Sequence, residues 1–218
     1  MIDLGPLGDR AFLARFESGR AAAAWADSVR SSRIAGVLDV VLAYLGVAVF
    51  ADPELADLRG LEATLRRIVA GDASDRGIAR HHRLPVVYDG DDLMDVAARL
   101  GRAIDDVISL HCDREYAVMA VGFLPGFPYA GELAPELSGL SRRDRPRARV
   151  PAGSVAIAGR QTGVYPRESP GGWHLLGRTP LTIADPDRGH FPIRPGDRIS
   201  FERIDSDEFR ARSGEQLA

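Results

Sequence analysis

The stretch Pro146–Pro180 reads PRARVPAGSVAIAGRQTGVYPRESPGGWHLLGRTP, and it decides the fold class of the second part of the chain. Short apolar runs such as SVAIA are separated by glycine and proline, which interrupt helices and long strands. Many short strands with this punctuation are typical of a closed or nearly closed β-barrel. Similar runs occur on both sides of the stretch, in REYAVMAVGF and IRPGDRISFERI, so we expect one barrel in the second part of the chain.

The first part of the chain has a different pattern. Only 2 of the 14 prolines fall in residues 1–84, and the other 12 fall in residues 85–218. Apolar periodicity in the first part indicates alternating strands and helices. The expected elements are a strand pair ending in RAFLARF, a helix from about Ser18 to Arg33, two buried valine-rich strands within Ile34–Ala51, and a second helix. The second helix has Asp52 as its N-cap and Pro53 at its first position, ends at Gly71, and carries on one face Leu55, Leu58, Leu61, Leu65 and Ile68.

These patterns predict two domains. Residues 1–84 form an α+β N-terminal domain, in which a sheet is covered on one side by two helices. The strand RLPVVY closes this domain or bridges to the next one. Residues 85–218 form the β-barrel domain, which also contains two short helices, in DDLMDVAARLG and AIDDVISLH. The charged tail after Ile204 is expected to fray.

The charged residues limit the chemistry that the chain can perform. A net charge of −3 argues against general nucleic-acid binding, which requires a basic face. The chain contains no lysine, so it has no phosphate-cradling GxxxxGK[ST] loop and no lysine Schiff base. Any bound anion must therefore be held by arginine, histidine, hydroxyl groups or backbone N–H groups.

The sequence indicates a cytoplasmic protein without a membrane segment. Cys112 is the only cysteine, so an internal disulfide is impossible. The first residues, MIDLGPLGDR, lack the basic and apolar regions of a secretory signal. The apolar stretch Ile34–Ala51 is interrupted by Asp39 and by two glycines, which favours two strands over a membrane span.

The histidines and serines do not form a known catalytic or metal-binding pattern. His81 and His82 are adjacent, so on a strand they point to opposite faces. His111 and Cys112 lack a second pair at metal-ligand spacing, and we predict no metal site in this chain. Ser154 lies in AGSVA, which is not the GxSxG nucleophile elbow, and we interpret it as a turn residue.

Four blocks of the sequence resemble the signature of one family. They are GFLPGFPYAGEL, PRARVPAGSVAIAGRQTGVYP, SPGGWHLLGRTP and RPGDRISF, in this order. The chain is similar in these blocks to the KipI family, also named allophanate hydrolase subunit 1 or the B subunit of 5-oxoprolinase. The resemblance covers the chain from LPVVYDG to the end, about two thirds of it, and departs from the family pattern at Ala130 and Glu132.

The resemblance implies an α+β N-terminal domain followed by a cyclophilin-like β-barrel of the carboxyltransferase C/D type. It also implies a partner with a related barrel, the family's subunit 2 or the C subunit of 5-oxoprolinase, and a possible further partner, the A subunit of 5-oxoprolinase. The implied activity is the ATP-dependent hydrolysis of the small-molecule substrate 5-oxo-L-proline to L-glutamate, with ATP bound by the complex. Two alternatives stay open: a non-catalytic inhibitor of a sensor histidine kinase, and a carboxyltransferase-like subunit of the urea or allophanate type.

The block Gly122–Leu133 supplies aromatic candidates for the site. Two prolines exclude a helix and a strand interior here, so the rings lie on a stiff loop. We interpret Phe123, Phe127 and Tyr129 as an apolar wall at the barrel mouth, with burial in the barrel core as the alternative. Phe123 and Phe127 are candidates for substrate binding, and Phe127 and Tyr129 for the partner interface.

The stretch Pro146–Pro180 supplies the polar candidates. Gln161 and Arg178 lie in glycine-punctuated turns and are the candidate catalytic residues, because glutamine can donate to an oxyanion and arginine matches carboxylate or phosphate oxygens. In the alternative interpretation, Arg178 ties the barrel together through backbone carbonyls. The candidate substrate-binding residues in this stretch are Arg147, Thr162, Tyr165 and Ser169.

Overall fold

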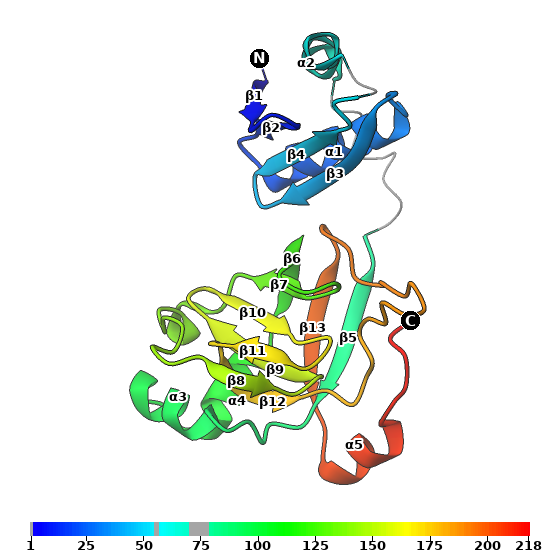
Figure 1. Cartoon of the computed structure of the whole chain (residues 1–218). Helices are drawn as coiled ribbons and strands as arrows, with labels where there is room; N and C mark the ends of the chain where they lie inside the picture. The colour runs from blue at the N-terminus through cyan, green and yellow to red at the C-terminus, as the bar shows by residue number, and fades with distance from the viewer. Residues whose placement is uncertain (1, 55–56, 70–78) are drawn as a thin grey trace. The chain divides into compact units, whose positions relative to one another are not determined.

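The chain divides into two compact units, Met1–Ala79 and Arg80–Ala218. The structure is a computed structural model that describes residues 2–54, 57–69 and 79–218 (Figure 1). The division lies five residues before the expected boundary at 84/85. The reason is that β5 (His81–Val86), which contains most of RLPVVY, pairs in parallel with β13 (Arg198–Arg203) of the second unit.

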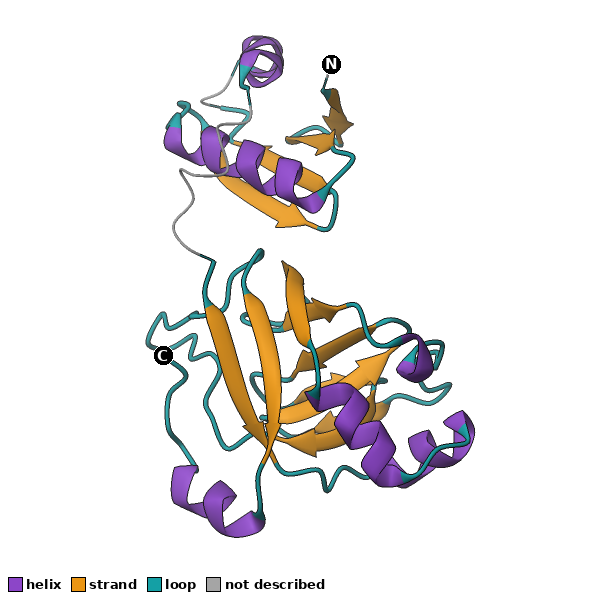
Figure 2. Ribbon diagram, turned by 180° about the vertical axis from the view of Figure 1, so that it is seen from behind, coloured by secondary structure: helices purple, strands orange, loops and turns teal. Residues whose placement is uncertain are grey.

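The first unit contains a four-stranded antiparallel sheet with the strand order β1-β2-β4-β3. Helix α1 crosses one face of β3 and β4 (Figure 2). It begins after Ser18, whose side chain accepts a hydrogen bond from the N–H of Ala21 at 3.2 Å. The elements of this unit are β1 (Asp3–Leu7), β2 (Ala11–Arg15), α1 (Gly19–Ser31), β3 (Val37–Ala43), β4 (Gly46–Ala51) and α2 (Leu58–Arg67).

Helix α2 begins later than the sequence predicts. Its N-cap is Asp57, which accepts from the N–H of Arg59, whereas Asp52 forms a local turn by accepting from the N–H of Glu54. Pro53 therefore precedes the helix instead of opening it. Leu61 and Leu65 are buried against α1 and the sheet, as the periodicity predicts, with Leu58 and Ile68 packed beside them. Leu55 and Gly71 lie outside the described residues.

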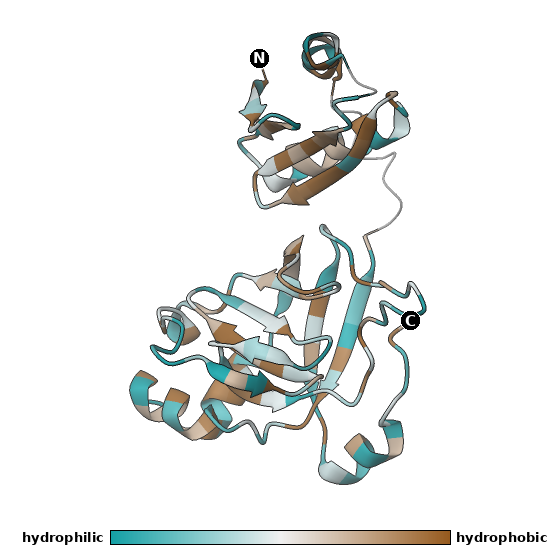
Figure 3. Cartoon of the chain, viewed as in Figure 1, coloured by the Kyte–Doolittle hydropathy of each residue, from teal (hydrophilic) through white to brown (hydrophobic). Residues whose placement is uncertain are grey.

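The valine-rich strands β3 and β4 are buried on one face only. Val40, Leu42, Val47 and Val49 face the core around Trp25, while Val41 and Phe50 are exposed. The expectation of two buried strands is thus correct for the inner face alone. Hydropathy along the two strands is high (Figure 3), because apolar residues occupy the outer face as well.

The second unit is a nearly closed barrel built on a seven-stranded sheet, in the order β12-β9-β10-β7-β6-β13-β5. All neighbours are antiparallel except β5 and β13. The two edges meet where Val87 and Arg178 exchange two backbone hydrogen bonds of 3.0 Å. The barrel elements are β5, α3 (Leu93–Leu100), α4 (Ile104–Cys112), β6 (Glu115–Val121), β7 (Pro128–Gly131), β9 (Ser154–Ala158), β10 (Gln161–Val164), β12 (His174–Arg178), β13 and α5 (Ser206–Arg212).

A two-stranded ribbon, β8 (Arg147–Val150) with β11 (Ser169–Gly171), accompanies the barrel. Strand β9 separates two apolar clusters by the alternation of its side chains. Val155 and Ile157 belong to the large cluster inside the barrel, and Ala156 and Ala158 belong to a smaller cluster on the opposite face. The smaller cluster also contains Val150 of β8, so the ribbon packs on the outside of the barrel wall.

The residues after Ile204 are ordered, in contrast to the expectation that they fray. Asp205 caps α5 by accepting from the N–H groups of Asp207 and Glu208. The final residues return to the barrel, where the N–H of Leu217 donates to the carbonyl of Thr182 at 3.1 Å. Leu217 is buried in the main cluster and anchors the tail.

Two glycines allow the edges of the barrel to meet. A Cβ atom at Gly90 would lie 2.4 Å from the carbonyl oxygen of Leu175, and one at Gly177 would lie 2.3 Å from that of Val87. Contacts this short with backbone atoms force the chain to move. The seam, by which we mean the place where the two barrel edges meet at Val87 and Arg178, therefore requires glycine at both positions.

We predict that Gly90→Ala destabilises the barrel by about 2–3 kcal/mol, as overpacking against backbone does. Urea unfolding followed by tryptophan fluorescence measures the loss. Gly122→Ala is the matched control in the same unit, because nothing lies within 4 Å of its Cβ position. Equal stability of the two variants would contradict the importance of the seam.

Candidate functional site

Phe127 is the centre of an aromatic cluster beneath the β8–β11 ribbon. Its ring centroid lies 5.0–5.6 Å from four other rings, and each pair meets edge to face. The four neighbours are Phe123, Tyr129, Tyr165 and Trp173. Five rings from three segments of the chain are thus joined in one cluster on the outer face of the barrel wall.

The position of this cluster corrects the expected apolar wall at the barrel mouth. Phe127 is only 1% exposed, so it contacts neither a substrate nor a partner from this position. Tyr165 is also buried, and Tyr129 is half-buried. Phe123 is 61% exposed. Of the three rings of the Gly122–Leu133 block, Phe123 is therefore the one most open to a ligand.

The loop that carries Phe123 is tightly constrained. The N–H of Phe127 donates to the carbonyl of Leu124, and the N–H of Gly122 donates to the carbonyl of Phe127, both at 3.0 Å. Phe123 has a φ of 68°, a left-handed conformation that costs a non-glycine residue about 1 kcal/mol or more. A large exposed ring held at such a cost points to a contact made by that ring.

A buried carboxylate, Asp92, lies at the edge of the ribbon and holds two arginines. Its Oδ2 and Oδ1 accept from Nη1 and Nη2 of Arg147, each at 2.8 Å, in a bidentate pair. Oδ1 also accepts from Nη1 of Arg143, and Oδ2 accepts from the N–H of Leu175 at 2.8 Å. Asp92 thereby ties the start of α3 to β12 and to the segment that leads into β8.

The charge of Asp92 is stable at neutral pH. Burial alone would raise the pKa of this carboxyl, but the hydrogen bonds from Arg147 and Leu175 and the charges of Arg147 and Arg143 lower it below its ordinary value. The same pair raises the pKa of Arg147. The exposed Asp91, 3.8 Å from Arg147, adds a second negative charge beside the two guanidinium groups.

Tyr165 connects the arginine cluster with the aromatic cluster. Burial raises the pKa of its phenol, while a hydrogen bond with the Trp173 backbone and the charges of Arg142 and Arg147 act in the opposite direction. A Cβ atom at Gly171 would lie 2.4 Å from the Tyr165 hydroxyl oxygen, so glycine is required beside it. Arginine side chains and aromatic rings therefore adjoin at one end of the ribbon, and we define this region as the ribbon site.

Thr162 lies inside the barrel, which excludes its expected contact with substrate. Its Oγ1 donates to the carbonyl of Ala156 at 3.1 Å and accepts from Nε2 of His111 at 2.9 Å. Nδ1 of His111 then accepts from the Tyr88 hydroxyl at 2.7 Å. Burial lowers the pKa of His111 to about 3, so the ring is neutral and the chain of hydrogen bonds is structural.

The two expected catalytic residues are not brought together. Gln161 pairs with Ala158 at one end of β9, and Arg178 pairs with Ser154 at the other end. These ends are four residue steps apart, which is about 13 Å along a strand. The two candidate residues therefore lie beside opposite ends of β9.

Arg178 binds side chains of neighbouring elements. Its Nε and Nη2 donate to Oδ2 of Asp89 at 3.0 and 2.8 Å, and its guanidinium lies 4.6 Å from the ring centroid of Phe209 on α5. It therefore links β12 to the loop after β5 and to α5. Ser169 is buried and donates to the carbonyl of Pro170, so its hydroxyl is also used within the chain.

Sequence reasoning missed Asp92, Arg143 and Trp173. Asp92 lies in the run DGDDL directly before α3, where an acidic residue is ordinarily interpreted as a helix cap. Its side chain makes no capping hydrogen bond.

His81 is exposed and His82 is buried, where it contacts Asp197, as expected for adjacent residues on a strand. In the ranges 2–54, 57–69 and 79–218, no cluster of three potential metal ligands occurs.

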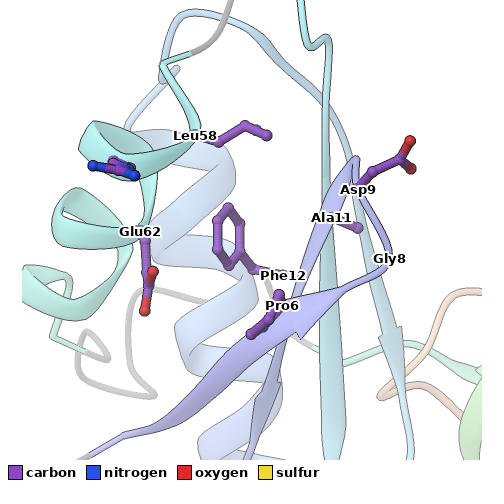
Figure 4. A pocket seen from close by; sticks show the side chains of 8 residues that line it. Pro6, Gly8, Asp9, Ala11, Phe12, Leu58 and Glu62 are labelled. Carbon is purple, nitrogen blue, oxygen red and sulfur yellow. The ribbon is translucent and has the colours of Figure 1, made fainter.

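The first unit contains an open groove of about 190 Å³ between the β1–β2 hairpin and α2 (Figure 4). The ring of Phe12 lies between the hairpin and α2, with Asp9 on the hairpin and Glu62 on the helix, and Arg59 is a further lining residue. The other lining residues are Pro6, Gly8, Ala11 and Leu58. Its polar groups belong to exposed elements and do not converge on one point, so the ribbon site is the stronger candidate.

Comparison with known proteins defines the class of this chain. Residues 2–193 match the family described as carboxyltransferase domain, subdomain C and D. The chain belongs to this family. No described helix has the length and apolar character needed to cross a membrane.

Its relatives include proteins named as the B subunit of 5-oxoprolinase. The protein of that name from Bacillus subtilis (strain 168) is 33% identical over 94% of both chains, and that from Haemophilus influenzae is 36% identical over 81% of this chain and 84% of its own. The Escherichia coli O157:H7 protein is 50% identical, but the match spans 58% of its length. Membership of the family inferred from the four sequence blocks is thus confirmed.

Solved structures support the same architecture. TTHA0988 is 40% identical with a TM-score of 0.81, over 90% of this chain and 40% of that protein. PH0987 from Pyrococcus horikoshii is 36% identical with a TM-score of 0.57, over 94% of this chain and 99% of that one. The urea amidolyase of K. lactis, 17% identical over 100% of this chain and 16% of its own, shares the fold with a TM-score of 0.73.

We predict that Asp92→Asn destabilises the barrel by about 2–4 kcal/mol, because it leaves two arginines without their buried counter-charge. The folded-state pKa of Asp92 is lowered, so its contribution is complete above the unfolded value of about 3.9 and is lost as the pH falls through the lowered value. The stability difference between the native chain and the variant should therefore shrink only below about pH 4.

Urea unfolding at several pH values measures this difference. Asp91→Asn is the matched control, since Asp91 is adjacent, 76% exposed and 3.8 Å from Arg147, and its removal should cost less than about 1 kcal/mol. An Asp92→Asn variant as stable as the Asp91→Asn variant would show that the cluster contributes little to the fold.

Proposed function

We propose that this chain is the B subunit of a 5-oxoprolinase complex, which hydrolyses 5-oxo-L-proline to L-glutamate as ATP is converted to ADP and phosphate. The observation that carries the proposal is the match with the B. subtilis and H. influenzae proteins of that name, which extends over 94% and 81% of this chain. The family match over residues 2–193 supports it.

The proposed reaction needs ATP because a lactam resists direct attack by water. Transfer of the γ-phosphoryl group to the lactam oxygen gives ADP and activates the ring carbon. Water then adds to this carbon, the ring C–N bond breaks with protonation of the nitrogen, and an acyl phosphate results. A second water molecule hydrolyses the acyl phosphate to the glutamate carboxylate and phosphate.

The ribbon site offers groups that suit part of this chemistry. The substrate carries a carboxylate, and in a chain without lysine the planar guanidinium of arginine is the side chain that matches it. Arg147 is held rigidly by Asp92 and is one-fifth exposed. We assign it to the substrate carboxylate, with the half-buried ring of Tyr129 beside the lactam ring.

ATP and the remaining catalytic groups are assigned to the complex. The chain has no phosphate-cradling loop, which supports a nucleotide site shared with or contained in a partner. The proposed partners are the C and A subunits of 5-oxoprolinase. Gln161 and Arg178 remain candidates for contacts with the substrate.

The test of this function is co-expression with the partner proteins and assay of glutamate release from 5-oxo-L-proline. The complex should release glutamate only with ATP, and this chain alone should show no turnover because it lacks a phosphate-cradling motif. A complex that assembles but releases no glutamate would overturn the proposal. Turnover by the single chain would overturn the shared site.

We assign the partner contact to Phe123, in place of the buried Phe127. Phe123→Gly should leave stability unchanged or raise it by up to about 1 kcal/mol, because glycine adopts the left-handed backbone without strain. It should weaken binding of the partner about 5–30-fold, as loss of an interface anchor does.

Thermal unfolding and equilibrium binding to the C subunit measure the two effects. Met94→Ala is the control, since Met94 is an apolar side chain on α3 that is 73% exposed. A Phe123→Gly chain that binds the partner as tightly as the Met94→Ala chain would contradict this assignment.

A further inference from the structure

The sheet of the first unit has an outer face that neither helix of that unit covers. Helices α1 and α2 both pack on the inner face, where Trp25, Leu61 and Leu65 share one apolar cluster with strand residues. Residues that lie opposite each other on neighbouring strands point to the same face, so the register of the strands assigns the outer face. In the strand order β1, β2, β4, β3, its three rows are Leu7, Ala11, Phe50 and Asp39; Gly5, Leu13, Ala48 and Val41; and Asp3, Arg15, Gly46 and Ala43.

This outer face is apolar in its centre and charged only at two opposite corners. The charged residues lie in the first and third rows and are Asp39, Asp3 and Arg15. The side chains of Leu7, Val41 and Phe50 are each about two-fifths exposed, and Figure 3 shows β3 and β4 as predominantly apolar. An apolar centre with charges at the rim is the composition of a protein–protein interface, and exposed apolar patches mark such sites.

The turn between β3 and β4 adds two large apolar side chains next to the third row. Tyr44 and Leu45 form this turn and are each about half exposed. Tyr44 has a φ of 55°, a left-handed conformation that glycine or asparagine ordinarily takes in a hairpin turn and that costs other residues about 1 kcal/mol. The N–H of Phe16 donates to the carbonyl of Leu45 at 2.9 Å and holds the turn in place. Large apolar side chains on a strained and exposed turn point to a contact made by them.

Side chains occupy backbone groups on both edges of this sheet, which disfavours the addition of a partner strand. On the β3 edge, the N–H of Val40 donates to Oδ1 of Asp39 and its carbonyl accepts from Nη2 of Arg30, both at 2.7 Å. On the β1 edge, the carbonyl of Leu4 accepts from Nη2 of Arg66 at 2.7 Å. A strand that paired with either edge would have to displace these groups. The face is therefore a better surface for a partner than the edges.

The outer face is complementary to a second copy of itself. A two-fold axis parallel to the strands, midway between two such faces, places β1 of one copy opposite β3 of the other and β2 opposite β4. Each row then meets the same row of the second copy in reverse order. In the centre, large side chains face small ones, as packed sheets require. The facing pairs are Phe50 with Ala11, Leu13 with Ala48, and Val41 with Gly5.

The remaining positions fit the same arrangement. Asp39 faces Leu7 at the rim, and Asp3 and Arg15 face Ala43 and Gly46, so no like charges meet. A Cβ atom at Gly5 would have nothing within 4 Å, which leaves room above this glycine for a side chain of a second copy.

We infer that this chain forms a symmetric dimer in which the outer faces of the two first-unit sheets pack against each other. The five large apolar side chains of the face and the turn offer about 100 Å² each. Two copies therefore bury about 1,000 Å², the area that a specific interface needs. Homodimer interfaces are also more apolar than transient contacts between different proteins, which favours a second copy as the occupant.

Sedimentation equilibrium of the full chain over about 1–500 μM tests the dimer. The native chain should pass from one to two chains per particle across this range. Val41→Glu should raise the Kd of the dimer at least about 30-fold, because it places a carboxylate without a partner in the centre of the interface. Its thermal transition should shift by a few degrees at most, since Val41 is exposed in the single chain. Val69→Glu is the matched control, the same change at an exposed valine outside the sheet, and should alter the Kd less than about twofold.

A mixed dimer tests which residues face each other. Because Val41 of one copy faces Gly5 of the other, a Gly5→Arg chain places a guanidinium opposite the new carboxylate of a Val41→Glu chain. These two chains should pair at least about 5-fold more tightly than the Val41→Glu chain pairs with the native chain. If the Val41→Glu chain loses its thermal transition, Val41→Thr replaces it in the sedimentation experiment, and its buried hydroxyl should still raise the Kd about 3–10-fold.

Several outcomes would overturn the inference. A native chain that stays single over the whole range forms no such dimer. A dimer that Val41→Glu leaves intact uses another surface, and mixed chains that pair no more tightly than the reference contradict the two-fold arrangement. A single native chain whose binding to the C subunit is weakened by Val41→Glu would assign the outer face to that partner instead.

Discussion

The ribbon site depends on the carboxylate of Asp92, which accepts hydrogen bonds from three donor groups. Arg143 and Arg147 lie before and in β8, and Leu175 lies in β12, so one buried charge joins the start of α3 to two segments that are more than fifty residues away. A buried ion pair of this kind contributes little net stability compared with apolar packing, but it imposes one arrangement on its partners. Here that arrangement is the orientation of two guanidinium groups.

The aromatic cluster holds the β8–β11 ribbon on the barrel. The ribbon is too small to hold itself against the barrel by backbone hydrogen bonds, and Phe127 provides the apolar surface that it covers, together with Tyr165 and Trp173. The barrel thus has one core inside its sheet and another outside it. The polar groups of the site lie where the outer core ends, which places charged side chains beside rigid rings and away from the main interior.

Much of the fold could be predicted from the sequence, because glycine, proline and apolar periodicity act locally. The helix after Ser18, the valine-rich hairpin and the short strands of the barrel follow from these signals. The site could be predicted only in part. Burial of Thr162 depends on which strand face it occupies, and burial of Phe127 depends on the distant residues packed over it. The role of Asp92 depends on arginines more than fifty residues away. The order of the final residues likewise depends on a backbone contact with Thr182, which no local pattern reveals.

The parallel pairing of β5 with β13 has a consequence for the synthesis of the protein. Arg198 lies opposite His81, so the strands that meet are separated by 117 positions along the chain (198 − 81). A ribosome must therefore release almost the entire second unit before its first strand finds a neighbour on that side. Until then β5 is an open edge that other chains can pair with, and loop closure over such a distance is slow. Residues 81–86 therefore stay open to pairing with other chains until late in translation.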